Sequence, residues 1–201
     1  MMKTFLVLSA CILLVASGAH AFADTVLLKS GAAPVGQPDP SVVVYGATPL
    51  QQAVVINRAH PWWADPIPGT NWVSLSTGAI GLDHSYYYWE TTFSLPDRYA
   101  NPTVTASYQC DDGGINLMLN GIAWGGGAGF YPGDARTYST SQADMFHPGI
   151  NSLTFVVYND TAWTGVDFSA LVSYDTVPEP CAVGVLLTGL CCLGGLVRFR
   201  K

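Results

Sequence analysis

The chain has few basic residues. Eight lysines and arginines stand against fourteen aspartates and glutamates, which gives a formal net charge of −6. Between residues 24 and 176 the imbalance is larger, with thirteen acidic and only four basic side chains. An acidic surface that is poor in lysine argues against nucleic acid or an anionic membrane surface as a partner. It suits sugars, cations and cationic partners.

Cysteine is also scarce. Of the five cysteines only Cys110 lies between residues 24 and 176, so this part cannot form an internal disulfide and its stability must come from an apolar core. Cys110 continues the alternation of Val104, Ala106 and Tyr108. We therefore predict that Cys110 points inward as a small apolar side chain; an intermolecular disulfide is the alternative.

Motifs of common enzymes are absent. The chain has no Gly-x-Ser-x-Gly, its four histidines lack the spacing of metal ligands, and residues 125–129 lack the Gly-Lys-Ser/Thr of a phosphate-binding loop. Carboxylates are present, but no spacing selects the pair that glycoside hydrolysis requires. We predict that the protein is not an enzyme, and a glycan-active enzyme is the less favoured alternative.

The first 23 residues have the pattern of a secretory signal peptide. Lys3 precedes an apolar run over residues 5–16, and Ala19, Ala21 and Ala23 provide small residues for two alternative cleavage sites. An uncleaved anchor helix is the alternative, but the apolar run is short for a membrane span. The sequence therefore predicts export, followed by a domain over residues 24–176.

Residues 177–201 have the pattern of a C-terminal membrane anchor. An apolar run over residues 181–197 would form a helix of roughly 25 Å, slightly shorter than the hydrocarbon thickness of a bilayer. Basic residues that follow a membrane helix stay on the cytoplasmic side, so the domain would lie outside. The residues that carry this prediction are Pro178, Glu179, Pro180, Arg198, Arg200 and Lys201.

This order of Pro-Glu-Pro, apolar helix and basic end resembles the PEP-CTERM sorting tail of bacterial proteins. The resemblance covers only the tail. It implies processing near residues 178–180 by an exosortase-type membrane protease, after which the product is released or attached at the cell surface. An ordinary single-pass C-terminal anchor is the alternative.

Strands and turns account for the pattern between residues 24 and 176, and no amphipathic helix is evident. Residues 86–95 alternate, with Tyr87, Trp89, Thr91, Phe93 and Leu95 on one face. Several short strands with one buried face each make a β-sandwich. We predict the others at residues 25–29, 42–45, 51–56, 71–75, 103–110, 115–119, 122–124, 153–157 and 166–174.

One turn is specified by its residues. Asn120-Gly121 is the typical pair of a two-residue type I′ hairpin, because both positions need a positive φ angle. The register that follows places Leu119 opposite Ile122 and Leu117 opposite Trp124.

Three segments are similar to elements of galactose-binding-like jelly rolls: residues 86–96, residues 111–121 with their acidic pair and Asn-Gly, and residues 148–153. The similarity covers about residues 51–175 and implies a jelly-roll β-sandwich. Carbohydrate-binding modules, accessory domains of glycosidases and adhesion domains share this fold, so the fold does not settle the function.

The aromatic residues supply candidates for a binding site. The alternation places Trp89 and Trp124 inward, and Trp72 begins a predicted strand, so these three belong to the core. Exposed aromatic rings near loops stack on the apolar faces of sugars. The candidates in predicted loops are Trp62, Trp63, Tyr131 and Trp163; the alternative is that these rings plug the ends of the sandwich.

The acidic pair Asp111-Asp112 lies before Gly113-Gly114. Jelly rolls of the type named above often hold a structural Ca²⁺ through loop carboxylates, which are hard oxygen ligands. Turn formation is the alternative, since Asp-Gly is common in turns. No other cofactor is expected.

Together these features predict an exported, non-enzymatic protein of the cell surface or extracellular matrix whose single domain binds polysaccharide. A structural or adhesive protein that binds another protein through the same loops is the alternative.

Overall fold

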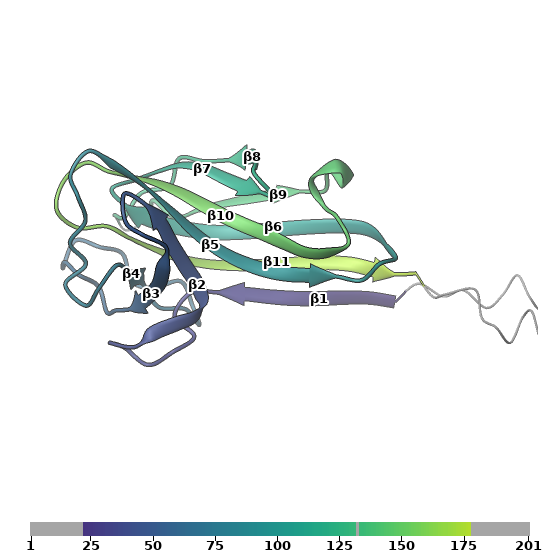
Figure 1. Cartoon of the computed structure of the whole chain (residues 1–201), viewed down its shortest axis with the longest axis horizontal. Helices are drawn as coiled ribbons and strands as arrows, with labels where there is room; N and C mark the ends of the chain where they lie inside the picture. Colours follow the sequence, from purple (N-terminus) through teal and green to yellow (C-terminus); the bar gives the residue numbers. More distant parts are fainter. Residues whose placement is uncertain (1–21, 132, 178–201) are drawn as a thin grey trace, which may run out of the picture.

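The computed structural model describes residues 22–131 and 133–177 (Figure 1). This part is all-β, as predicted, and contains one short 3₁₀ helix, η1 (Ala143–Met145). No helix in the described ranges is long and apolar enough to cross a membrane. The strands are β1 (Phe22–Lys29), β2 (Pro38–Gly46), β3 (Gln51–Val55), β4 (Val73–Ser74), β5 (Ser85–Leu95), β6 (Tyr99–Asp111), β7 (Gly113–Leu119), β8 (Ile122–Gly125), β9 (Arg136–Thr140), β10 (Gly149–Asn159) and β11 (Gly165–Thr176).

The strands form one continuous antiparallel sheet that folds over on itself. Its order is β8-β7-β10-β5-β2-β3-β4-β11-β6-β9, and β1 pairs with β11. Figure 1 shows β5 and β10 in front of β6 and β11, with β2, β3 and β4 at one end of the molecule. The two long pairs, β5 with β10 and β6 with β11, therefore make the two layers between which the core lies.

Aromatic rings join the two layers. Phe155 of β10 stacks on Phe168 of β11 with ring centroids 4.4 Å apart, and it lies 5.2 Å from the ring of Tyr108 on β6. Large aromatic side chains bury much apolar surface, which drives folding here, where the described residues contain one free cysteine and therefore no internal disulfide. The predicted inward face of residues 86–95 is confirmed, because Tyr87 and Trp89 are at most 1 % exposed.

Cys110 is also confirmed as an inward residue. Its side chain is fully buried, and its Sγ donates a weak hydrogen bond to the carbonyl oxygen of Ala128 at 3.6 Å. Burial, and secondarily the charges of Asp111 and Asp112, raises the pKa of the thiol well above its ordinary value. A thiol that is buried and protonated is a poor partner for an intermolecular disulfide.

The hairpin of β7 and β8 is partly as predicted. Asn120 and Gly121 have positive φ angles of 50° and 81°, and Leu119 pairs with Ile122. The predicted pairing of Leu117 with Trp124 is wrong, because the register shifts by a β-bulge and Leu117 pairs with Gly125. Trp124 is half-buried against the core.

The start of β1 bears on the predicted signal peptide. Residues 1–21 and the tail from residue 178 lie outside the described residues. Phe22 and Ala23, which we assigned to the signal peptide, pair with Thr176 and Asp175 of β11. Cleavage after Ala21 would keep β1 whole, whereas cleavage after Ala23 would remove its first two residues. The signal peptide itself stays a prediction.

Candidate functional site

A small open pocket lies where four connections meet, at the end of the sandwich opposite to Phe22 and Val177. The connections are β3–β4, β6–β7, β8–β9 and β10–β11, at the left in Figure 1. The pocket has a volume of about 140 Å³. Its lining consists of His60, Trp62, Trp63, Asp111, Asp112, Phe130, Tyr131, Thr161 and Trp163.

All four predicted stacking residues line this pocket, and three of them are at least partly exposed. Trp62 is 63 % exposed and Tyr131 is 51 % exposed, and Trp163 is half-buried. The ring of His60 joins the two tryptophans, with centroids 4.3 Å from Trp62 and 4.8 Å from Trp163. The ring of Tyr131 rests on Phe130 at 4.2 Å. Two aromatic groups, from three separate loops, therefore line one hollow.

Trp63 corrects the fourth prediction. Its ring is 1 % exposed and packs on Trp72 at 4.3 Å, so it offers no free face for a sugar. Its Nε1 donates a hydrogen bond to Asp111 Oδ2 at 2.7 Å. The prediction failed because Trp62 and Trp63 are adjacent and point to opposite sides, and their letters do not tell which one faces the core.

Hydrogen bonds hold the β3–β4 loop in place. The Ala64 amide donates to the Phe130 carbonyl oxygen at 2.7 Å, which ties this loop to the β8–β9 loop. Arg58 Nη1 donates to the Trp63 carbonyl oxygen at 3.2 Å and forms an ion pair with Asp65 Oδ1 at 3.1 Å. The position of the two tryptophans is thus fixed by the fold, although the loop itself has no regular structure.

The acidic pair has two separate roles. Asp111 is 3 % exposed, and burial first, then the neighbouring carboxyl group of Asp112, raises its pKa to about 8. Asp112 is half-buried, and its Oδ2 accepts hydrogen bonds from the Asp160 amide at 2.6 Å and the Thr161 amide at 3.1 Å. Asp112 therefore anchors the loop that carries Trp163.

Calcium at Asp111 and Asp112 stays a prediction. One carboxylate oxygen of each residue already accepts hydrogen bonds from the protein. In the part of the chain that the structure describes, no three His, Cys, Asp or Glu side chains are grouped as metal ligands would be. Main-chain carbonyls would have to supply most of the oxygen ligands that calcium needs.

The sequence prediction missed His60, Phe130 and Thr161 as members of the site. His60 lies two residues before Trp62 in the segment His-Pro-Trp-Trp, and this aromatic cluster was the available signal. Phe130 likewise adjoins the predicted Tyr131. Nothing in the sequence marks Thr161 as part of this site; in the structure its amide donates a hydrogen bond to Asp112.

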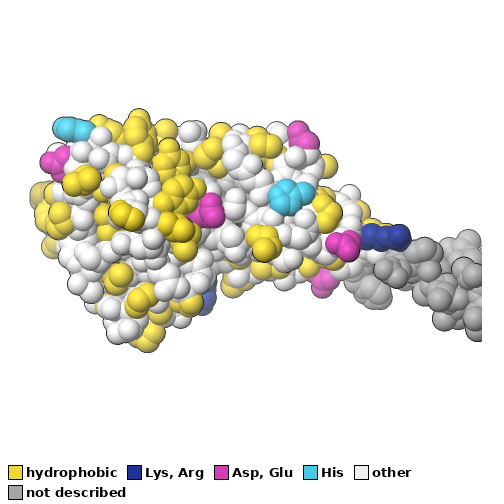
Figure 2. Space-filling view, viewed as in Figure 1, with side chains coloured by type: hydrophobic (Ala, Val, Ile, Leu, Met, Phe, Trp, Pro, Cys, Tyr) yellow, Lys and Arg dark blue, Asp and Glu magenta, His cyan; other side chains and the backbone are white. Residues whose placement is uncertain are grey.

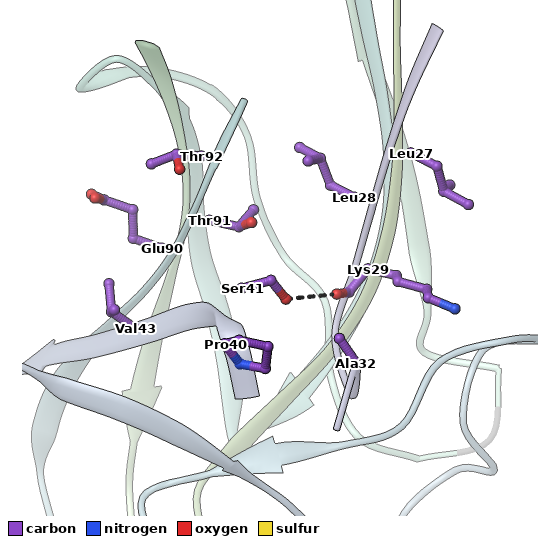
Figure 3. Close-up of a pocket in the computed structure, with 10 residues that line it drawn as sticks. All are labelled: Leu27, Leu28, Lys29, Ala32, Pro40, Ser41, Val43, Glu90, Thr91 and Thr92. Carbon is purple, nitrogen blue, oxygen red and sulfur yellow. Dashed lines mark hydrogen bonds between the residues drawn. The ribbon is translucent and has the colours of Figure 1, made fainter. Parts of the chain in front are cut away.

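A second hollow lies between β1, β2 and β5 and has a volume of about 350 Å³. Figure 3 shows Leu28 and Thr91 facing each other across it, with Pro40 and Ser41 beside them, while Leu27 and Lys29 point away. None of its ten lining residues is aromatic. It is larger than the loop pocket but lacks rings on which a sugar could stack.

Tyrosines form a third feature, on the outer face of the front layer. Tyr45 stacks on Tyr88 with ring centroids 5.2 Å apart, and Tyr86 lies 5.1 Å from Tyr158. Figure 2 shows a band of hydrophobic-type side chains on this face. These tyrosines lie on strands, in contrast to the aromatic residues of the pocket, which lie in loops.

No protein-family model matches this chain. No curated protein matches it either. Among solved structures, the chain is similar to a family 35 carbohydrate binding module from Clostridium thermocellum, with 10 % identity, a TM-score of 0.42 and coverage of 73 % of this chain and 97 % of that one. A CBM35 from Paenibacillus barcinonensis gives 20 % identity, a TM-score of 0.30 and coverage of 68 % and 98 %.

An FMN-binding beta-glucuronidase from Facaelibacterium prausnitzii L2-6 is also similar in part, with 13 % identity, a TM-score of 0.43 and coverage of 76 % of this chain and 23 % of that one. At TM-scores below 0.5, these similarities identify neither a family nor a ligand for this chain.

Proposed function

We propose that this is an exported, non-enzymatic protein whose β-domain binds polysaccharide through the pocket at the end of the sandwich. The observation that carries the proposal is that Trp62, Tyr131 and Trp163, from three separate loops, surround one open hollow. The proposal also includes the fold type, a jelly-roll β-sandwich of the galactose-binding-like type. The two layers of antiparallel strands support it.

The chemistry of the pocket suits a sugar. A pyranose ring has faces of C–H groups that stack on indole and phenol rings, and its hydroxyl groups need hydrogen-bond partners at the edge. Thr161 and Asp112 line the pocket beside the rings and offer such partners. The volume of about 140 Å³ is below the roughly 300–1,000 Å³ of pockets for drug-sized ligands, which fits one sugar ring of a longer chain.

Binding to a glycan array, followed by affinity measurements on variants, tests this proposal. We expect Trp62→Ala and Tyr131→Ala each to weaken binding of the retained polysaccharide about tenfold, because each removes an exposed stacking ring. Leu50→Ala is the control, since Leu50 is 70 % exposed but does not line the pocket. Retention of no polysaccharide would sink the proposal, and release of reducing ends would favour a glycan-active enzyme.

A second candidate function is adhesion to another protein. The tyrosines of the front face, Tyr45, Tyr86, Tyr88 and Tyr158, favour it, because tyrosine is enriched in the core of protein–protein interfaces. The test is retention of the protein on cells or extracellular matrix. If this face carries adhesion, Tyr88→Ala should abolish retention and Trp62→Ala should leave it unchanged. The reverse pattern supports the pocket.

The proposal also includes export and sorting. A signal peptide over residues 1–23 would direct secretion, and an exosortase-type protease would process the chain near Pro178-Glu179-Pro180 after a transient membrane-anchored stage. The order of motifs in residues 177–201 supports this. The processed protein would then reside at the cell surface or in the extracellular matrix.

A further inference from the structure

Acidic side chains line the loop pocket, but lysine and arginine do not. Among its nine lining residues are two aspartates, Asp111 and Asp112, and no lysine or arginine. Arg58, in the loop that carries Trp62, forms an ion pair with Asp65, which lies outside the lining. A ligand that enters this hollow therefore meets two carboxyl groups and the imidazole of His60, but no lysine or arginine.

The rings add to this preference. The faces of aromatic rings carry negative electrostatic potential and attract cations that lie above them, with tryptophan the strongest of the three ring types. Trp62 and Trp163 both contact the ring of His60, and Phe130 and Tyr131 form a second group. An ammonium group between these rings would meet π faces together with a carboxylate.

Asp111 shows that the polar part of the site is incomplete. Its Oδ2 is occupied by the indole of Trp63, whereas its Oδ1 is buried and has no hydrogen-bond partner among the described residues. Buried polar atoms without a partner are rare and costly in proteins. A positive charge in the adjoining pocket would stabilise this carboxyl group in its ionised form.

We infer that the pocket binds a cationic amino sugar, a hexosamine residue with a free amine, within a polysaccharide. The inference rests on the proposed function and names its ligand class. The amine would lie by Asp112 while the sugar face stacks on Trp62 or Tyr131. The Asp112 carboxylate would repel a uronic acid, so acidic polysaccharides should bind more weakly.

Two oligosaccharides that differ only in the amine test the inference. Calorimetry on the protein purified from its host would compare β-1,4-linked glucosamine oligomers with the matching N-acetylglucosamine oligomers, in weakly acidic buffer that keeps the amine protonated. We expect the amine form to bind about tenfold tighter. The difference should shrink at high salt, because salt screens the charge interaction. A uronic acid oligomer should bind more weakly than either.

Asp112→Asn is the diagnostic variant. An asparagine oxygen still accepts the hydrogen bonds of the Asp160 and Thr161 amides, so the loop should keep its place. We expect this variant to bind the amine and acetylated forms with equal affinity, because the charge that distinguishes them is removed. Asp83→Asn is the matched control, since Asp83 Oδ1 likewise accepts an amide of the same loop, from Ala162 at 2.9 Å, and Asp83 does not line the pocket.

The outcomes separate the inference from the proposed function. Equal binding of the amine and acetylated oligomers, lost in Trp62→Ala, would overturn the inference and leave polysaccharide binding intact. Preference for the uronic acid would overturn it in the same way. Binding of no oligosaccharide or polysaccharide would overturn both. The salt dependence and the uronic acid comparison need no variant, so a failure of Asp112→Asn to fold would not prevent the test.

Discussion

Asp111 couples the stability of the fold to pH. Its pKa is raised from 3.8 to about 8 by burial and by Asp112. Between these two values the native protein keeps the proton that the unfolded chain releases, so the native state binds more protons. Stability from this residue is therefore greatest at acidic pH and falls as the pH rises from about 4 towards 8. Asp167, whose pKa burial also raises, acts in the same direction.

Asp111→Asn should reduce this pH dependence. The amide is neutral at every pH and its oxygen can still accept the hydrogen bond from Trp63, so the packing should be kept. The measurement is the free energy of unfolding by urea at a series of pH values across the window. Asp65→Asn, at a side chain that is 87 % exposed, should keep the wild-type slope. An unchanged slope in Asp111→Asn would show that the carboxyl group ionises freely in the fold.

For single residues, the sequence was enough to select most of the aromatic side chains of the pocket, but not to tell which of two adjacent tryptophans is exposed. Trp62, Tyr131 and Trp163 were predicted because exposed aromatic rings near loops can stack on the apolar faces of sugars. The structure places these three residues in the lining of one pocket. Trp63 could not be separated from Trp62, because loops have no periodicity that assigns neighbouring side chains to opposite faces.

Among the elements, the β7–β8 hairpin depends most visibly on its turn residues. Asn120 Nδ2 donates to the Met145 carbonyl oxygen at 2.8 Å and to Asn151 Oδ1 at 2.7 Å, and its Oδ1 accepts the Ser152 amide at 2.9 Å. The turn is therefore linked to η1 and β10 as well as to its own strands. Gly121 beside it has a φ of 81°.

Gly121→Ala should destabilise the domain by about 1 kcal/mol, the cost of a left-handed conformation for a residue with a Cβ. No atom lies within 4 Å of the position that the Cβ would take, so this cost is conformational only. Gly113→Ala is the control, because that position is equally open and its φ is not positive. Urea unfolding of both variants measures the difference; equal stabilities would mean that the turn relaxes into another type.

The sequence predicted strands well where apolar residues alternate over a long segment. The alternation over residues 86–95 matches β5, and Asn-Gly located the hairpin. Strand β9 (Arg136–Thr140) was missed because most of its residues are exposed, so the alternation of apolar residues is absent. The bulge at Trp124 could not be predicted because register depends on the partner strand rather than on the local sequence.

The whole molecule separates its pocket from its termini. Gly165 begins β11 at the pocket end and Thr176 ends it beside Phe22. The 12 residues of β11, at about 3.3 Å each, place roughly 40 Å between the two ends. An anchor at residues 177–201 would thus hold the domain with its pocket directed away from the membrane.

Replacement of Pro178, Glu179 and Pro180 by alanine tests the proposed sorting at this scale. We expect a chain that stays in the membrane fraction with its tail, because the processing site is lost. It should still bind polysaccharide, because the pocket is remote from the tail. Intact mass and fractionation of the protein from its host measure both forms, and processing of the variant at the same position would refute the assignment.

The pairing of the first strand with the last has a consequence for the timing of folding. Lys29 pairs with Ser169 and Phe22 with Thr176, so β1 finds its partner only when almost the whole domain is available. In a chain that leaves the cell N-terminus first, the sheet cannot close until its final strand has emerged. Contacts between residues so distant in sequence form slowly. The chain would therefore stay unfolded while it passes through a translocation channel, until its tail arrives.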